Sequence, residues 1–190
     1  TRLDNQQSAS GQFVFIVYGV IAVITEQGRY LVPPRQVIWL PGATDYRLVA
    51  ATPAAIVRFQ LSQQTQHQLN NTTTVLAVDG FLLSLLTESI DRQVMNFGAL
   101  AYHHLSHLLL SRLELAPPLS LLLPAIKDPR LLAITRRQQK FPALKTDLVA
   151  WGKFVKTSSR TLTRLFKNET GMTYSQWKQI MLIHIAIIEL

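Results

Sequence analysis

The N-terminal part of the chain alternates short apolar runs with glycine and proline turns, a pattern typical of β-strands. Residues 13–25 are dense in Phe, Val, Ile and Tyr, which suit a pleated, packed surface. Shorter runs at 30–32 and 37–40 each end at a proline-containing turn. Residues 56–61 alternate apolar and polar side chains, as a half-buried strand does. Short strands separated by such turns predict a small barrel or sandwich rather than a parallel βαβ sheet.

The apolar spacing becomes helical after the last of these strands. A polar run at 62–71 is expected to form a loop, and residues 72–78 fit one more strand. Apolar side chains then recur over 81–90 at the spacing of one helical face, and a second helix is expected at 97–115. Two apolar helices beside a small barrel could cap its core or form the seam of a homodimer, and the spacing fits both.

The rest of the chain is predicted to be a linker followed by a run of capped helices. Prolines bracket an apolar LSLLL segment, and Asp128-Pro129 then supplies an N-cap and a proline at the first helical position. We therefore expect an α+β protein with two modules. Its segments are a barrel at 1–78, a helical capping or dimerisation segment at 79–116, a linker at 117–127 and a helical domain at 128–190.

Three end signals are expected to delimit the later helices. Ser158 is placed to cap the N-terminus of a helix that runs to about residue 168. Gly171 can adopt the left-handed conformation that closes it. Thr173 and Gln176 have the spacing of a capping box for the helix that follows.

The formal charge is concentrated in the last third of the chain. Residues 1–126 contain seven basic and seven acidic residues, whereas residues 127–190 contain twelve and four, so the net charge of +8 lies there. This asymmetry indicates a neutral module joined to one that meets a polyanion, although a solvated basic surface has the same charge. There is no cysteine, and no apolar run reaches the roughly 18 residues of a membrane helix. We expect a cytoplasmic protein with no membrane partner.

The helix at 158–168 is predicted to separate an apolar face from a cationic one. Its leucine and phenylalanine side chains fall together at 100° per residue. The opposite face carries polar and basic side chains, which are Arg160, Thr163, Arg164 and Lys167.

A second helix, from about residue 146, precedes this segment across a tight turn and contains the small residue Gly152. Two short helices joined in this way are typical of a helix-turn-helix, whose second helix enters the major groove of DNA. An arginine there can bind O6 and N7 of guanine, while Ser, Thr and Lys on the flanks hold phosphates. An ordinary amphipathic helix with a hydrated basic face is the alternative. The tight turn and the charge asymmetry together favour DNA binding.

Three segments of the basic domain match one known pattern. They are the DPRL opening from Asp128, the string SSRTLTRLFKNETGMTYSQW from Ser158 to Trp177, and Ala186 with Leu190 in the next helix. In these residues the stretch 128–190 resembles the first half of the DNA-binding domain of AraC/XylS-type transcription regulators.

This resemblance implies a partner and a set of DNA-binding residues. The partner is double-stranded DNA. Arg160, Thr163 and Arg164 stand where the recognition helix of the family reads bases. Ser158 and Lys167 stand near phosphates. The family also implies regulation of transcription rather than catalysis.

The barrel resembles the cupin-like sensor of a subgroup of these regulators. The shared features are the Gly11-Gln12 pair, the GRYLVPP turn at 28–34 and the WLPG turn at 39–42. The resemblance implies a small-molecule effector and a homodimer as further partners. It also predicts an N-terminal cupin-like β-barrel followed by an all-α helix-turn-helix domain.

The family's DNA-binding domain holds two helix-turn-helix units joined by a long helix, and the resemblance implies that this chain stops inside that helix. Residues 180–188 are apolar almost all round, so that helix needs partners on several sides. Leu182 stands where an arginine is usual. We expect a truncated or decayed regulator, with further residues missing before Thr1.

Neither a metal nor another cofactor is expected. Cupin relatives keep histidines where this chain has Ser8, Ser10 and Asp45. His103 and His107 have a spacing that can hold a metal on a helix, but no third ligand is evident. We expect an exposed or interface histidine cluster there.

Catalytic signatures are absent from the sequence, which contains neither a G-x-S-x-G elbow nor a glycine-rich phosphate loop. Tyr18, Trp39 and Phe59 could line a ligand cavity, and simple core positions are the expectation. We predict a regulator that is not an enzyme. A cupin-type metal-binding protein or enzyme, or a non-functional regulator fragment, is the alternative.

Overall fold

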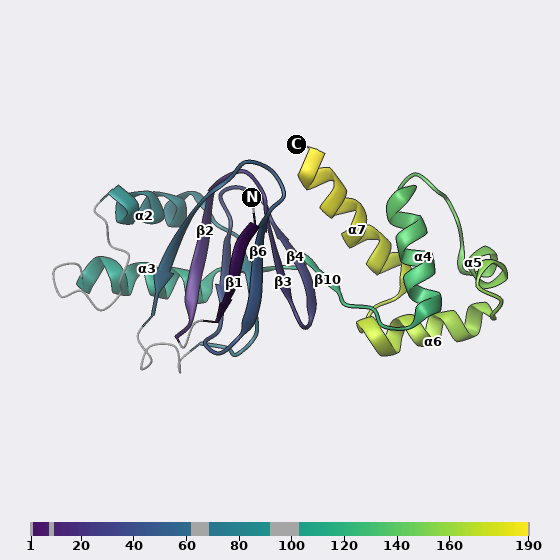
Figure 1. Ribbon diagram of the computed structural model, residues 1–190. Coiled ribbons are helices and arrows are strands. Elements are labelled where there is room, and N and C mark those ends of the chain that lie inside the picture. Colours follow the sequence, from purple (N-terminus) through teal and green to yellow (C-terminus); the bar gives the residue numbers. More distant parts are fainter. Residues whose placement is uncertain (1, 8–9, 62–68, 92–102, 190) are drawn as a thin grey trace. The chain divides into compact units, whose positions relative to one another are not determined.

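The computed structural model describes residues 2–7, 10–61, 69–91 and 103–189 (Figure 1). The chain forms two compact units, one of residues 1–25 with 30–121 and the other of residues 26–29 with 122–190. A β-rich N-terminal part is followed by helices, which confirms the predicted α+β class. The first part of the helix expected at 97–115, and most of the loop expected at 62–71, lie outside the described residues.

The chain forms two antiparallel sheets, in the orders β1-β6-β3-β4-β10 and β7-β2-β5-β8-β9, and most of their strands belong to the first unit. Their strands are β1 (Arg2–Gln7), β2 (Gln12–Tyr18), β3 (Ile21–Thr25), β4 (Gly28–Val32), β5 (Val37–Leu40), β6 (Asp45–Ala50), β7 (Ala55–Gln60), β8 (Thr74–Leu76), β9 (Pro118–Leu119) and β10 (Leu122–Pro124). The segment expected as a linker at 117–127 thus contains two short strands, and the boundary between the units falls between residues 121 and 122.

The apolar run at 13–25 forms two strands because the chain passes from one sheet to the other at Gly19. Gly19 has φ of 75°, a left-handed conformation that glycine adopts without strain. An added Cβ would also collide with the carbonyl oxygen of Pro53. Besides the two short strands in the expected linker, β1 and β6 were not expected from the sequence. β1 is polar in sequence, and it was identified only by its pairing with β6.

Helices α2 (Gly80–Asp91) and α3 (His103–Leu115) cover one face of the β7-β2-β5-β8-β9 sheet, and Figure 1 shows them on the side of β2. The apolar stripe of α2 is buried at Leu82 and Leu86, and α3 buries Leu109 and Leu113 in the same cluster as Phe13. Of the two roles left open by the sequence, the structure shows the capping role. Asp79 caps α2 by accepting the Leu82 N–H at 2.7 Å.

The second unit contains α4 (Pro129–Lys140), α5 (Leu148–Phe154), α6 (Ser159–Thr170) and α7 (Tyr174–Glu189). The predicted end signals are confirmed. Ser158 accepts the Thr161 N–H, and Gly171 closes α6 in the left-handed conformation. Thr173 and Gln176 exchange backbone-to-side-chain hydrogen bonds of 2.9 and 3.3 Å. Among the described residues, no helix combines the length and the apolar run that crossing a bilayer requires.

A chain of buried hydrogen bonds ties three helices of the second unit together. The indole N–H of Trp151 in α5 donates to the Tyr174 hydroxyl of α7 at 2.8 Å, and that hydroxyl donates to Oε1 of Gln138 in α4 at 2.7 Å. The Gln138 amide in turn donates to carbonyls of the loop after α4. Burial raises the pKa of Tyr174, which keeps the hydroxyl as a donor. Tyr174 is therefore the residue that links Trp151 to Gln138 in this chain of hydrogen bonds.

Replacing Tyr174 by phenylalanine is expected to lower the free energy of unfolding by about 1–3 kcal/mol, because the Trp151 N–H and the Gln138 oxygen lose their buried partner. Urea unfolding followed by circular dichroism measures the change. Tyr18→Phe is the matched control, since Tyr18 is 57% exposed, and its stability should stay near that of the parent. Equal stabilities for the two variants would contradict the assigned role of Tyr174.

Candidate nucleic-acid interface

The turn between α5 and α6 is held by a close backbone contact at Gly152. The Thr157 N–H donates to the Gly152 carbonyl at 2.8 Å. A Cβ at position 152 would lie 2.5 Å from the Thr157 carbonyl oxygen, so only glycine permits the contact. Lys156 takes a left-handed φ of 54° to close the turn. This is the tight helix-turn-helix connection expected from the sequence.

The inner face of α6 is anchored in the core of the second unit. Leu162 and Phe166 are fully buried. The Phe166 ring lies 5.4 Å from the Tyr174 ring and 6.2 Å from the Trp177 ring, between ring centroids. Aromatic pairs at such distances add to the stabilisation from area burial. The orientation of α6 about its own axis is therefore set by packing.

Glu169 provides a second anchor that the sequence reasoning missed. Its carboxylate accepts the backbone N–H groups of Lys127 and Asp128, each at 2.9 Å, just before α4. An acidic residue in the last turn of a helix opposes the helix dipole. That unfavourable position was a signal in the sequence that Glu169 has a partner elsewhere in the fold.

The outer face of α6 carries the predicted side chains. All of them are exposed, namely Arg160, Thr163, Arg164 and Lys167, with Ser158 exposed at the helix start. The first four lie at i, i+3, i+4 and i+7, which is one side of a helix. The structure therefore brings the four together and places Ser158 at their N-terminal edge.

The two arginines differ from the other side chains of this face in their hydrogen bonding. Ser158 serves as the N-cap, and the Thr163 hydroxyl donates to the Ser159 carbonyl at 3.0 Å. The Lys167 ammonium donates to the Gly171 carbonyl at 2.8 Å. Arg160 and Arg164 make no hydrogen bond or ion pair with any residue that the structure describes. Like charges four residues apart cost a helix about 0.2–0.5 kcal/mol, so folding alone does not account for this pair.

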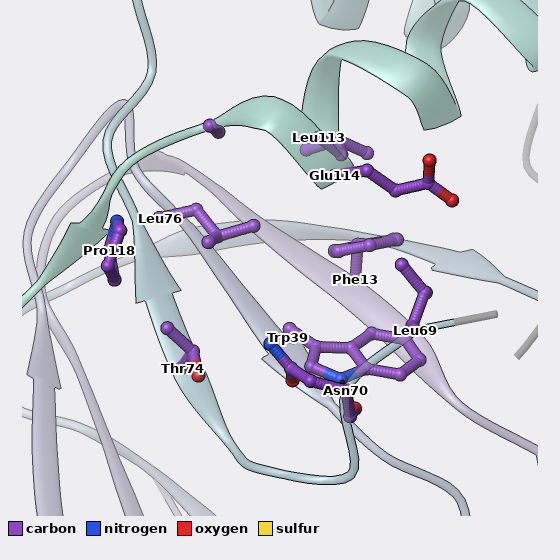
Figure 2. Close-up of a pocket in the computed structure, with 10 residues that line it drawn as sticks. Phe13, Trp39, Leu69, Asn70, Thr74, Leu76, Leu113, Glu114 and Pro118 are labelled. Carbon is purple, nitrogen blue, oxygen red and sulfur yellow. Dashed lines mark hydrogen bonds between the residues drawn. The ribbon is translucent and has the colours of Figure 1, made fainter. Parts of the chain in front are cut away.

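The other candidate site residues singled out in the sequence belong to the first unit. Tyr18 is exposed, contrary to the expected core position, whereas Phe59 and Trp39 belong to the core, and Trp39 also lines a pocket of the first unit (Figure 2). Within the described ranges, no three His, Cys, Asp or Glu side chains are placed to hold a metal ion. The side chain of His103, and Ser8, lie outside the described residues.

A β-rich unit followed by a helix-turn-helix unit is the class of architecture that these observations define. Over 181 residues the chain is 24% identical to the HTH-type transcriptional regulator NimR of Escherichia coli (strain K12), which covers 95% of this chain. The chain is thus a distant homologue of a helix-turn-helix regulator, which confirms the resemblance to AraC-type regulators found in the sequence. The match spans 66% of the length of NimR. No family model matches the chain.

Solved structures of ToxT from Vibrio cholerae are also similar to the chain. A 1.65 Å structure has 12% identity and a TM-score of 0.39, with 98% of this chain and 77% of that chain covered. A structure of ToxT from Vibrio cholerae O395 bound to (E)-4-(8-methylnaphthalen-1-yl)but-3-enoic acid has 10% identity and a TM-score of 0.41, with the same coverage.

Substituting Gly152 by alanine is expected to destabilise the second unit by about 1–3 kcal/mol, because the added Cβ forces the turn away from α5. Gly80→Ala is the control, since a Cβ at the start of α2 meets no atom within 4 Å. Thermal unfolding of both variants measures the difference. Equal melting temperatures for Gly152→Ala and Gly80→Ala would show that the close contact does not hold the turn.

Proposed function

We propose that this chain is a sequence-specific DNA-binding transcription regulator that inserts α6 into the major groove of double-stranded DNA. The observation that carries the proposal is the pair Arg160 and Arg164, which have no partner among the described residues and project from a helix that buries Leu162 and Phe166 on its opposite face. The homology to a helix-turn-helix regulator supports the same function. Packing fixes the helix, and the two arginines make no contact within the described residues that DNA binding would have to break. They are therefore suited to base recognition.

The residues of this face are assigned distinct roles in the proposal. Arg160 and Arg164 bind base edges, and an arginine can hold O6 and N7 of guanine with two hydrogen bonds. Thr163, between them, contacts a base edge through its methyl or hydroxyl group. Lys167 retains further N–H donors beyond its bond to Gly171 and neutralises a phosphate. Ser158 marks the helix N-terminus, where backbone N–H groups favour an anion.

Exposed lysines on the elements before α6 extend the cationic surface. Lys153 lies in the last turn of α5 and Lys156 in the turn itself, and both are exposed. These side chains are proposed to contact phosphates on either side of the groove. With about five phosphates neutralised, the logarithm of the binding constant should fall with the logarithm of salt concentration at a slope of roughly −4 to −5.

The first unit is proposed to sense a small effector, and the regulator is proposed to act in the cytoplasm without catalysing a reaction. A homodimer is part of the same proposal. Its support is apolar surface on the two capping helices, where Phe81 is 52% exposed and Leu108 is 44% exposed. Such exposed apolar side chains are common where a copy of the same chain packs.

Replacing Arg164 by alanine is expected to weaken binding to a specific DNA site about 5- to 150-fold, since one arginine–guanine contact contributes about 1–3 kcal/mol of discrimination. The probe is the genomic fragment upstream of the chain's own coding sequence, titrated at several salt concentrations beside a scrambled duplex of equal length. Arg29→Ala removes the same charge from an exposed position on β4 and should change binding little. The proposed function would be overturned if the DNA affinity changed neither with salt concentration nor on substitution of Arg164.

A further inference from the structure

The first unit contains a pocket of about 170 Å³ that the DNA-binding function leaves without a role (Figure 2). It lies between the helix-covered face of β2, β5 and β8 and the C-terminal end of α3. Its wall is formed mainly by Phe13, Trp39 and Leu76 of the strands and by Leu113 and Glu114 of α3. Figure 2 shows Leu113 and Glu114 on the helix side and the Trp39 ring on the strand side.

Phe13 and Trp39 line the strand side of the pocket, and both are largely buried, with 1% and 3% of their surface exposed. The rings of Phe13 and Trp39 have centroids 4.7 Å apart. Gly11 makes room for this arrangement, because a Cβ at that position would overlap the Trp39 ring. The indole N–H of Trp39 donates to the Asn70 carbonyl at 2.9 Å. Since its one donor is satisfied, Trp39 offers the pocket a ring rather than a hydrogen bond.

The charge at the pocket is negative. Glu114 is the one ionisable residue among those that line it. It is exposed and makes no ion pair or hydrogen bond with any described residue. The basic residue two positions earlier, Arg112, is held by Asp79 at 2.8 Å. An unpaired carboxylate beside aromatic rings favours a ligand with a cationic end.

We propose that this pocket binds a small aromatic cation, a single ring that bears an ammonium or amidinium group. An engineered apolar cavity of about 150 Å³ in another protein accommodates benzene, so the space here suits one ring. The ring would occupy the pocket next to Trp39, and the cation would lie toward the exposed carboxylate of Glu114. That the ligand acts as the effector of a regulator rests on the proposed function, whereas the binding itself does not.

Benzylamine, benzyl alcohol and phenylacetate are matched probes that share a ring and differ in charge. Each is titrated into the full chain without DNA, and the indole N–H signals are followed in a ¹H–¹⁵N spectrum. The chain has three tryptophans, and Trp151 and Trp177 in the second unit serve as internal references. Trp39→Phe identifies the signal of the pocket. We expect benzylamine to shift the Trp39 signal selectively and to bind more tightly than the alcohol, with the acid weakest.

Glu114→Gln removes the proposed charge contact without changing the size of the side chain. It should weaken benzylamine binding about 2- to 5-fold, the range for an exposed charge pair, and leave benzyl alcohol binding unchanged. Glu26→Gln makes the same change at an exposed turn position outside the pocket and should alter neither affinity. Any of three results would overturn the proposal. They are a Trp39 signal that no probe moves, phenylacetate binding as tight as that of benzylamine, and equal effects of the two substitutions. Loss of DNA binding would leave it intact.

Discussion

The close approach of the α5–α6 turn to Gly152 is the contact on which the cationic face depends. Because the Thr157 N–H reaches the Gly152 carbonyl, the chain leaves α5 and starts α6 at Ser158 with little room for adjustment. The start of a helix decides which residues share each of its faces. A shift of one residue would rotate α6 by about 100° and turn the arginines toward the core.

Packing behind α6 lets the helix carry charges that do not favour folding. Arg160 and Arg164 repel each other, and Glu169 opposes the helix dipole at the other end. The burial of Leu162 and Phe166, each contributing about 1.5–3 kcal/mol, outweighs these terms. The bond from Glu169 to the start of α4 turns its unfavourable position into a tertiary link. Packing in the second unit thus fixes a helix face on which Arg160 and Arg164 have no partner among the described residues.

In both units, a hydrogen bond made by an aromatic side chain helps to position a proposed binding surface. In the second unit, Tyr174 joins Trp151 to Gln138 and so connects α4, α5 and α7 around α6. In the first unit, the Trp39 N–H bonds to the chain at Asn70, and this leaves the indole ring facing the pocket. In each case a buried N–H finds its partner inside the protein, because leaving it unpaired costs about 1–3 kcal/mol.

Local chemistry determined much of the second unit from sequence alone. Ser158, Gly171 and the Thr173–Gln176 pair mark helix ends through bonds within a few residues, and the cationic face follows from helical periodicity. Contacts between distant segments were decided only by the tertiary structure. The polar segment of β1 carries no strand pattern of its own and was assigned only by its pairing with β6, and the capping role of α2 and α3 required the sheet they cover. The pocket joins residues from β2 to β9, so no local pattern could reveal it.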